Sequence, residues 1–557
     1  MWNRADSRVI TGIEANSMRK GEQFMKKGIR LALAGLIMVG ALSGCMKKEN
    51  PAAGTAGSAA GEAAKTAETA APAGAPDDLN ETKTLVITHG AYPQTLDIQN
   101  QSDVFSSRPA GMIFETLMKI DPAGNYVPVL AEQWEYVDDT HLKFHLRKNV
   151  KFHNGDAMTA EDVRWSLIRA ANSSHVSSKA AFINTDDIVI EDDHTLIVGY
   201  KYPNASAYSA YSQLGLSILP SALYQDADTA DISKNPIGTG PYKYVGCVNG
   251  ESVTFVRNDE YWGEPAKIKN MVWKTITENA NRTIELETGG AHFSYDIPTT
   301  DIERVDSDSK MSLLMGPNFT IQYVCYNTQK APFHDVRVRK ALGMAVDKEA
   351  IRIAAYNGIG GLGVGPMVST TTYATEELDV ADYDLEAAKA LLAEAGYPDG
   401  FDIKIYTNEN QARIDAAQVV QNSWAKIGVR ATVTTLEYAA YYDAVNTGEY
   451  DVCFFGWVSN GDPDNTLYGL YHSSMIGASN YSHTDNPRVD ELLEAGRKEL
   501  DDSKREQIYI DLQKELVDYC PATYYWQGVN VYAYSNELMP IEYTPYNFEP
   551  WTYEWKK

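Results

Sequence analysis

Three glycines have the spacing of a dinucleotide-binding loop. Gly358, Gly360 and Gly363 satisfy the pattern G-x-G-x-x-G, in which backbone N–H groups at a strand-to-helix turn bind a pyrophosphate. Such a loop needs a strand before it and a helix after it, whereas these glycines follow a helix-like segment, 336–356, and run into Pro366. The surroundings therefore predict no nucleotide site.

Two histidines and an acidic turn are the candidates for metal ligands. His141 and His145 share the outer face of one strand-like segment, about 13 Å apart at the usual rise per residue, so one metal ion cannot bridge them. The run Asp462-Pro463-Asp464-Asn465 begins like a calcium loop, but the central glycine and the closing glutamate do not follow. We therefore predict no metal and no cofactor.

The chain shows no readable catalytic constellation. It has no G-x-S-x-G turn for a nucleophilic serine. Apart from Cys45 its cysteines are Cys247, Cys325, Cys453 and Cys520, and the absence of a C-x-x-C pair disfavours a zinc site or a disulfide framework. We expect small core residues, although a disulfide between two of them stays open. The sequence predicts a protein that is not an enzyme, with a secreted peptidase or glycosidase as the alternative of another class.

The start of the chain has the parts of a lipoprotein export signal. Basic residues at 26–30 precede an apolar run, 31–39, and the small-residue stop Leu42-Ser43-Gly44 precedes Cys45. The apolar run is shorter than the about 20 residues that span a bilayer. We predict that residues 1–45 form a signal region whose true start is Met25, and that Cys45 is lipidated. The protein would then be exported and lipid-anchored to the cell membrane, at its outer face or in a periplasm.

Composition divides the remainder into a tether and a body. Residues 46–82 are rich in Ala, Gly, Thr, Ser, Pro and Glu. This segment has too few apolar groups to offset the entropy lost on ordering, so we predict that it is a disordered tether. The body, from residue 83 onward, is long enough for two or three lobes. The whole chain has 49 basic and 75 acidic residues, and its net charge of -26 argues against nucleic acid as a partner.

Strand and helix signals alternate along the body, which predicts an α/β fold. A capping pair, Thr159 and Asp162, predicts a helix over 160–171, and Asp384 precedes a second helix that Gly396 would end. The expected strands are 84–88, 140–147, 195–200, 252–257, 271–277, 320–327, 402–406, 430–436 and 450–457.

Ordered motifs run along the body. They are 128–134 (PVLAEQW), 144–156 (FHLRKNVKFHNGD), 159–163 (TAEDV), 236–242 (PIGTGPY), 259–263 (DEYWG), 326–328 (YNT), 335–341 (DVRVRKA) and 391–397 (LLAEAGY). Together they resemble the motifs of the extracellular solute-binding proteins of oligopeptide, dipeptide and nickel ABC transporters. These segments span nearly the whole body in order.

The resemblance implies a two-lobed clamp, similar to periplasmic binding proteins, with an extra subdomain in the first lobe. We expect the first lobe at 83–318 plus 525–557, the extra subdomain at about 108–215, and the second lobe at 319–524. Crossovers near Asn318 and Tyr524 would form the hinge. A ligand that contacts both lobes would favour the closed state.

The family's amine-clamping loop corresponds to residues 456–464 of this chain (GWVSNGDPD). Trp457 matches the aromatic position, whereas Ser459 holds the place of the acid that binds a peptide's free amine. A neutral hydroxyl cannot supply a charge-assisted bond to an ammonium group. Either Asp462 or Asp464 replaces the acid, or the ligand lacks a simple free amine.

A second family position also departs from the pattern. The arginine that grips a dipeptide's carboxylate in some relatives corresponds to Thr407, and Arg413 is the nearest substitute. The alternatives are structural: Asp462 would cap a turn and Arg413 would lie on a solvated helix face.

The leading hypothesis is a monomeric, substrate-binding lipoprotein that captures peptides between two lobes and delivers them to an ABC permease. A receptor of the same family for oligosaccharides is an alternative, because 35 tyrosines and 10 tryptophans offer stacking faces. A metal-complex receptor is a further alternative, which the few His and Cys residues near the expected cleft disfavour.

Overall fold

The computed structural model describes residues 78–546 and 548–557. The predicted signal region, Cys45 and residues 46–77 of the predicted tether lie outside them. The last residues of that tether differ from the prediction, because Leu79–Thr82 form helix α2, capped by Asp78. Asn80 fixes α2 to the body: its carbonyl accepts from the N–H of Lys269 and its side chain from that of Trp555. No helix in the described part of the chain is long and apolar enough to cross a membrane.

A sheet of eleven strands runs through the body in the order β15-β14-β16-β12-β17-β11-β1-β10-β9-β8, with β13 paired to β17. Its strands are β1 (Thr84–His89), β8 (Tyr242–Val248), β9 (Ser252–Arg257), β10 (Asn270–Thr275), β11 (Phe293–Ser294), β12 (Met311–Tyr326), β13 (Gly361–Leu362), β14 (Asp402–Asn408), β15 (Arg430–Leu436), β16 (Val452–Val458) and β17 (Ala522–Ser535). The sheet contains both parallel and antiparallel strand pairs, and helices lie between many of its strands along the chain. The predicted α/β class is therefore confirmed.

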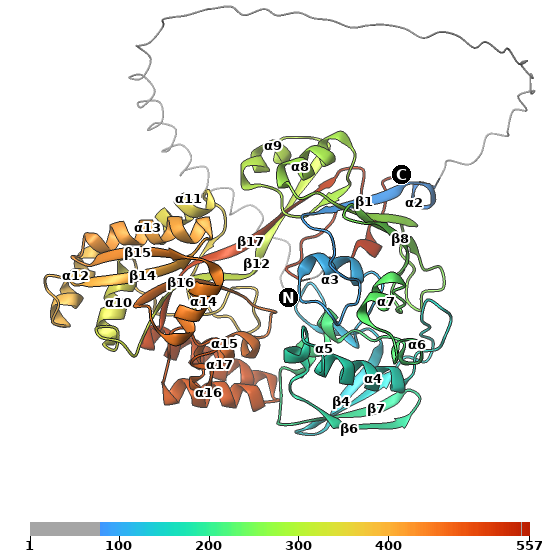
Figure 1. Cartoon of the computed structure of the whole chain (residues 1–557), viewed down its shortest axis with the longest axis horizontal. Coiled ribbons are helices and arrows are strands. Elements are labelled where there is room, and N and C mark those ends of the chain that lie inside the picture. Colours follow the sequence, from blue (N-terminus) through green and yellow to red (C-terminus); the bar gives the residue numbers. More distant parts are fainter. Residues whose placement is uncertain (1–77, 547) are drawn as a thin grey trace, which may run out of the picture. The chain divides into compact units, whose positions relative to one another are not determined.

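Two long antiparallel strands, β12 and β17, connect the two halves of this sheet (Figure 1). The half that contains β11, β1, β10, β9 and β8 is here called the N-terminal half, and the half that contains β15, β14 and β16 the C-terminal half. Their pairing is regular from Met311 to Pro317 and resumes at Ile321. The irregularity contains Asn318, and the strand opposite carries Gly528, where an added Cβ would lie 2.4 Å from the Asn318 side-chain oxygen. The chain therefore has a bulge between the two halves, and a side chain in place of Gly528 would push against Asn318 and Thr320 there.

The N-terminal half has two cores. The first is apolar and aromatic and lies around β1 and β10, with Trp273 and Phe293 fully or almost fully buried. The second lies under a four-stranded sheet, β4 (Ala131–Asp138), β5 (His141–Leu146), β7 (Thr195–Tyr200) and β6 (Ile183–Asp192), which α4 (Ala160–Ala171) covers. On β5 the alternate residues Phe144 and Leu146 are buried, and His141 and His145 lie on the other face, as predicted.

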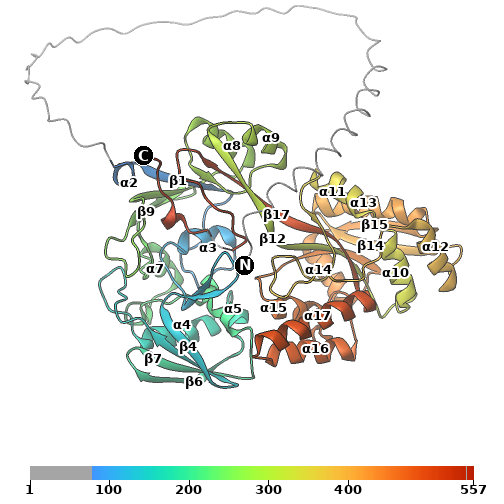
Figure 2. The ribbon, with the colours of Figure 1, turned by 180° about the vertical axis from the view of Figure 1, so that it is seen from behind.

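The C-terminal half is a sheet between two helical layers (Figures 1 and 2). Phe454 on β16 packs in one layer with α10 (Val336–Met344), α11 (Lys348–Tyr356), α12 (Leu385–Glu394) and α13 (Gln411–Ala425). Phe455, on the opposite face, packs in the other layer with α14 (Tyr438–Thr447), α15 (Pro463–Tyr471), α16 (Pro487–Lys498) and α17 (Asp502–Tyr519). The expected helix-like segment 336–356 is two helices, because Asp347 caps α11 and starts it anew.

Candidate functional site

A cavity of about 570 Å³, here called the cleft, adjoins the bulge between the two halves of the sheet. The N-terminal half contributes residues of α3 (Val104–Ala110), of β2 (Met118–Ile120) and of β10 to its lining. The C-terminal half contributes Phe319, Thr320 and the segment that follows β16, including Ser459 and Asn460. The cleft therefore brings together side chains from both halves, on either side of the two connecting strands.

Aromatic side chains form much of this lining. Trp273 stacks on Tyr295 with ring centroids 5.8 Å apart, and Tyr295 meets the edge of Tyr532 at 5.0 Å. Tyr532 in turn contacts Phe548 edge to face at 5.4 Å. These rings pack mainly against one another, with at most 8% of each exposed, and form a rigid apolar wall. Among the partly exposed rings of the lining are those of Tyr261, Trp262 and Tyr546.

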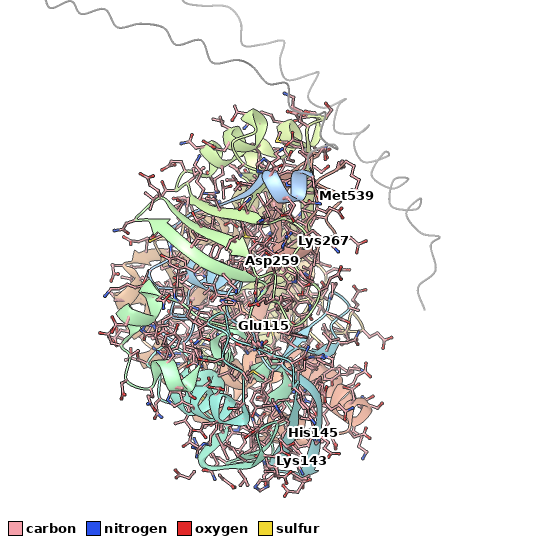
Figure 3. The ribbon with its side chains drawn as sticks, turned by 90° about the vertical axis from the view of Figure 1, so that its right-hand side faces the viewer. Glu115, Lys143, His145, Asp259, Lys267 and Met539 are labelled. Carbon is pink, nitrogen blue, oxygen red and sulfur yellow. The ribbon has the colours of Figure 1, made fainter. Side chains whose placement is uncertain are left out.

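Glu115 is a buried carboxyl in the cleft lining (Figure 3). It accepts hydrogen bonds from Tyr261 Oη at 2.6 Å, Trp262 Nε1 at 2.8 Å and Thr239 Oγ1 at 2.8 Å. Burial raises the pKa of Glu115 to about 7, although these three donors act in the opposite direction. Because its oxygens are already occupied, this carboxyl holds the lining together and offers little to a ligand amine.

Ser459 lies in the cleft, whereas Trp457 does not line it. The Ser459 N–H donates to the Phe319 carbonyl at 2.9 Å, and its hydroxyl accepts from the N–H of Gly461 at 3.3 Å. Trp457 pairs with Ile321 across β12 and β16 and packs partly buried against the core of the C-terminal half. Of the loop expected to hold a peptide's amine, the structure brings Val458, Ser459 and Asn460 to the cleft.

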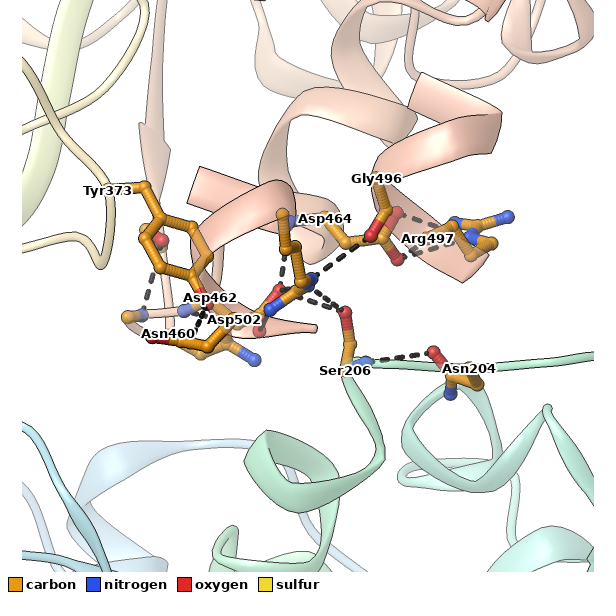
Figure 4. A network of polar contacts seen from close by, with 12 residues as sticks. Asn204, Ser206, Tyr373, Asn460, Asp462, Asp464, Gly496, Arg497 and Asp502 are labelled. Carbon is orange, nitrogen blue, oxygen red and sulfur yellow. Dashed lines mark hydrogen bonds and ion pairs between the residues drawn. The ribbon is translucent and has the colours of Figure 1, made fainter. Parts of the chain in front are cut away.

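Asp462 and Asp464 have protein partners and are not among the residues that line the cleft (Figure 4). Asp462 caps α15 and binds Arg505 through both carboxylate oxygens, at 3.0 and 3.1 Å. Asp464 makes three contacts of 3.0 to 3.1 Å with Arg497. The structure gives both carboxylates structural roles, and their contact with a ligand amine stays a prediction.

The same network joins the two halves of the body. Ser206, from the N-terminal half, donates through its hydroxyl to Asp462 at 2.9 Å and accepts from Arg505 at 2.9 Å (Figure 4). The neighbouring N–H of Ala205 donates to the carbonyl of Arg497 at 2.8 Å. A polar contact outside the cleft therefore ties the loop at Ser206 to the ends of α15 to α17.

Thr407 and Arg413 both belong to the C-terminal half and are not among the residues that line the cleft. Thr407 is fully buried on β14. Arg413, on α13, donates from Nε to Gln322 at 3.0 Å and from Nη1 to Asn408 at 3.1 Å, so it is not on a solvated face. Their part in carboxylate binding stays a prediction.

Sequence reasoning missed Glu115 as a centre of the cleft lining, yet a signal was present. Two of the motifs that carry the family resemblance, 236–242 and 259–263, supply its three donors. Those donors lie more than a hundred residues from Glu115 along the chain, and no local pattern links them.

Comparison with known proteins agrees with this architecture. The family described as "Bacterial extracellular solute-binding proteins, family 5 Middle" matches residues 125–478. Heme-binding protein A of Haemophilus influenzae is 32% identical over 418 residues, 69% of this chain and 76% of that protein. The dipeptide-binding protein of Escherichia coli is 32% identical over 431 residues, 71% of this chain and 80% of that protein.

A solved structure has the same fold over most of the chain. HbpA2 from Haemophilus parasuis has a TM-score of 0.79 and 26% sequence identity, and the match covers 85% of this chain and 100% of that one. With the family match and the similar relatives, it establishes the class of protein. The chain belongs to family 5 of the bacterial extracellular solute-binding proteins.

Proposed function

We propose that this protein captures peptides in the cleft and delivers them to an ABC permease, and that lipidated Cys45 holds it at the membrane. In this proposal residues 83–318 and 525–557 form the first lobe, 319–524 form the second, and ligand closes one onto the other. A dipeptide-binding relative at 32% identity supports the ligand class. The protein would work as a monomer.

The observation that carries the proposal is the composition of the cleft. Side chains from both halves line one cavity of about 570 Å³, large enough for a small solute. Both connecting strands pass beside it, so a ligand that contacts both sides would favour the state in which they approach. Neutral Ser459 and Asn460, together with aromatic rings, favour recognition by hydrogen bonds and stacking over an acidic clamp on the amine.

Native mass spectrometry tests this proposal directly. Protein purified from its host, or incubated with a defined mixture of di- to tetrapeptides, should retain intact peptides. The bound peptides should also raise its melting temperature. Cleaved peptides would indicate an enzyme, and retained sugars or metal complexes with no peptides would indicate another ligand class.

A haem-like metal complex is the second candidate, because Heme-binding protein A is among the similar relatives and the partly exposed rings of Tyr261, Trp262 and Tyr546 line the cleft. Among the described residues that line the cleft there is no histidine or cysteine to bind the iron. Such a ligand would therefore be held by its ring and its acidic groups. Titration with haem, followed by absorbance, separates this candidate from peptide binding.

A further inference from the structure

Arg108 presents a guanidinium group to the cleft from α3. Its Cζ atom lies 3.9 Å from the centroid of the Tyr295 ring, and its side chain is 20% exposed. The aromatic face fixes the plane of the guanidinium by a cation–π contact. The charge is thus held at the surface of the cavity and is largely removed from water.

One nitrogen of this guanidinium lacks the hydrogen-bond partner that its burial calls for. Its Nη1 atom is buried without a hydrogen bond to any described residue, and the carboxylate nearest to it, that of Asp296, is 4.0 Å away and half exposed. Arg282, close by, donates to the carbonyls of Tyr295, Ile276, Thr277 and Asp296. Buried N–H groups are almost always satisfied in proteins, so the contrast points to a missing acceptor at Arg108.

A second cation lines the same cavity. Burial lowers the pKa of Lys179, and no carboxylate of the described chain pairs with its ammonium group. The carboxyl groups in the lining are already committed, since Glu115 accepts three hydrogen bonds and Glu549 pairs with Lys119. In a chain of net charge -26, Arg108 and Lys179 are thus the cations of the described lining that have no carboxylate closer than 4.0 Å.

We propose that Arg108, supported by Lys179, is an anion subsite that binds a carboxylate of the captured solute. The inference rests on the proposed function and deepens it: the ligand is acidic, and its acidic end lies against α3. Arginine suits a carboxylate because its planar N–H fork can donate two parallel bonds to the two oxygens. In a cavity with little water this bond is stronger than at the surface. The subsite belongs to the N-terminal half, opposite the half that holds Thr407 and Arg413.

The test is a competition between free acids and amides on the full chain. Equimolar di- to tetrapeptides, as C-terminal acids and as isotopically marked C-terminal amides, are offered to the wild type and to Arg108→Gln, Lys179→Met and Arg488→Gln. Arg488 lies exposed on α16, where it pairs with Glu491, and gives a matched control. Melting curves of all variants establish that each is folded.

The wild type and the Arg488→Gln variant should retain acids about tenfold or more over amides, the usual size of a charge-assisted bond. The Arg108→Gln variant should lose most of that preference, and the Lys179→Met variant a smaller part. Equal retention of acids and amides by the wild type would overturn the subsite and leave peptide capture standing. Unchanged acid preference in Arg108→Gln would reduce Arg108 to a support for Tyr295 and would also overturn it.

A second arm does not depend on peptides. Wild type and variants are titrated with succinate and with inorganic phosphate while the melting temperature is followed. Suppose that succinate raises the melting temperature of the wild type but not of Arg108→Gln, and that phosphate has no such effect. This result supports a carboxylate site even if no peptide is retained, and only the proposal of peptide capture then fails. A rise with phosphate only, or with neither anion when no acid preference is seen, overturns the carboxylate subsite.

Discussion

Asp462 and Arg505 form a two-pronged ion pair that is almost wholly excluded from water, with contacts of 3.0 and 3.1 Å. The guanidinium also donates to the Gly496 carbonyl at 3.0 Å, which leaves the pair well satisfied. Asp462 further caps α15 through the N–H of Asp464 at 2.9 Å. One carboxylate thus serves a helix start, a buried arginine and the loop at Ser206.

Replacing Asp462 by Asn should destabilise the fold by about 3 to 5 kcal/mol, because the buried Arg505 charge is left without its partner. Urea unfolding measures the loss. Asp402→Asn is the matched control, since its pair with Arg430 is exposed and should contribute less than about 1 kcal/mol. A variant at Asp462 that stays as stable as the control, but no longer binds a free amine, would favour a ligand role for this carboxylate.

Ser206→Ala should weaken the contact between the two halves by about 1 kcal/mol, the usual net worth of a hydrogen bond. States that lack the contact then become more populated. We expect a larger scattering radius without ligand and about fivefold weaker binding. Ser307→Ala, at an exposed serine, is the control. If neither the radius nor the affinity changes, the contact has no part in closure.

The Glu115 carboxyl should make stability fall as the pH rises from about 4.5 to 7. Its pKa of about 7 in the fold lies above the ordinary value of 4.5, so the folded state holds a proton that the unfolded chain has released. The loss should approach about 3 kcal/mol and then level off above that range. Glu115→Gln should flatten this dependence in urea unfolding at several pH values. A variant whose profile keeps the wild-type slope would assign the dependence to other groups.

Acetylation of a peptide's amine should cost little affinity, because we predict that neutral Ser459 holds the place of the family's amine-binding acid. Ser459→Asp should shift the preference toward free amines, as calorimetry with acetylated and free peptides would show. If the wild type prefers the free amine by more than about a hundredfold, roughly 2.7 kcal/mol, another acid binds the amine. Asp462 or Asp464 would then be its partner.

Cys45→Ala should release the protein from membranes, since the predicted lipid anchor is attached at this residue. Fractionation of cells, followed by a high-salt wash, measures the effect. The wild type should stay with the membrane pellet. A variant that remains in the pellet after the wash would contradict the lipoprotein prediction.

Local patterns in the sequence predicted local structure well. The expected strands 195–200, 252–257 and 430–436 and the helix 160–171 have the observed bounds. Alternating burial and a capping box are written in neighbouring residues, so a single sequence suffices to identify them. The same holds for the apolar inner face of β5.

The pairing of strands that lie far apart in the chain could not be predicted from the sequence. Strand β17 was not expected. Strand β12 begins before the predicted strand 320–327, and the sequence hid this part of it because Gly316-Pro317-Asn318 resembles a loop. Only its pairing with β17, distant in the chain, makes that stretch a strand. The cleft has the same origin: Glu115, Arg108 and Tyr295 line one cavity only through tertiary packing, whereas the family motifs pointed to the loop with Ser459.

The ribbon of β12 and β17 limits how the two halves can move. Its cross-strand hydrogen bonds hold both connections in one register, so neither strand can slide or stretch without the other. Such a ribbon resists displacement along its length but yields to twist, and its ladder is interrupted beside Asn318 and Gly528. In the proposed closure of one half onto the other, we therefore expect the change to concentrate at this interruption, next to the cleft. A distance between two probes, one on each half, would follow it.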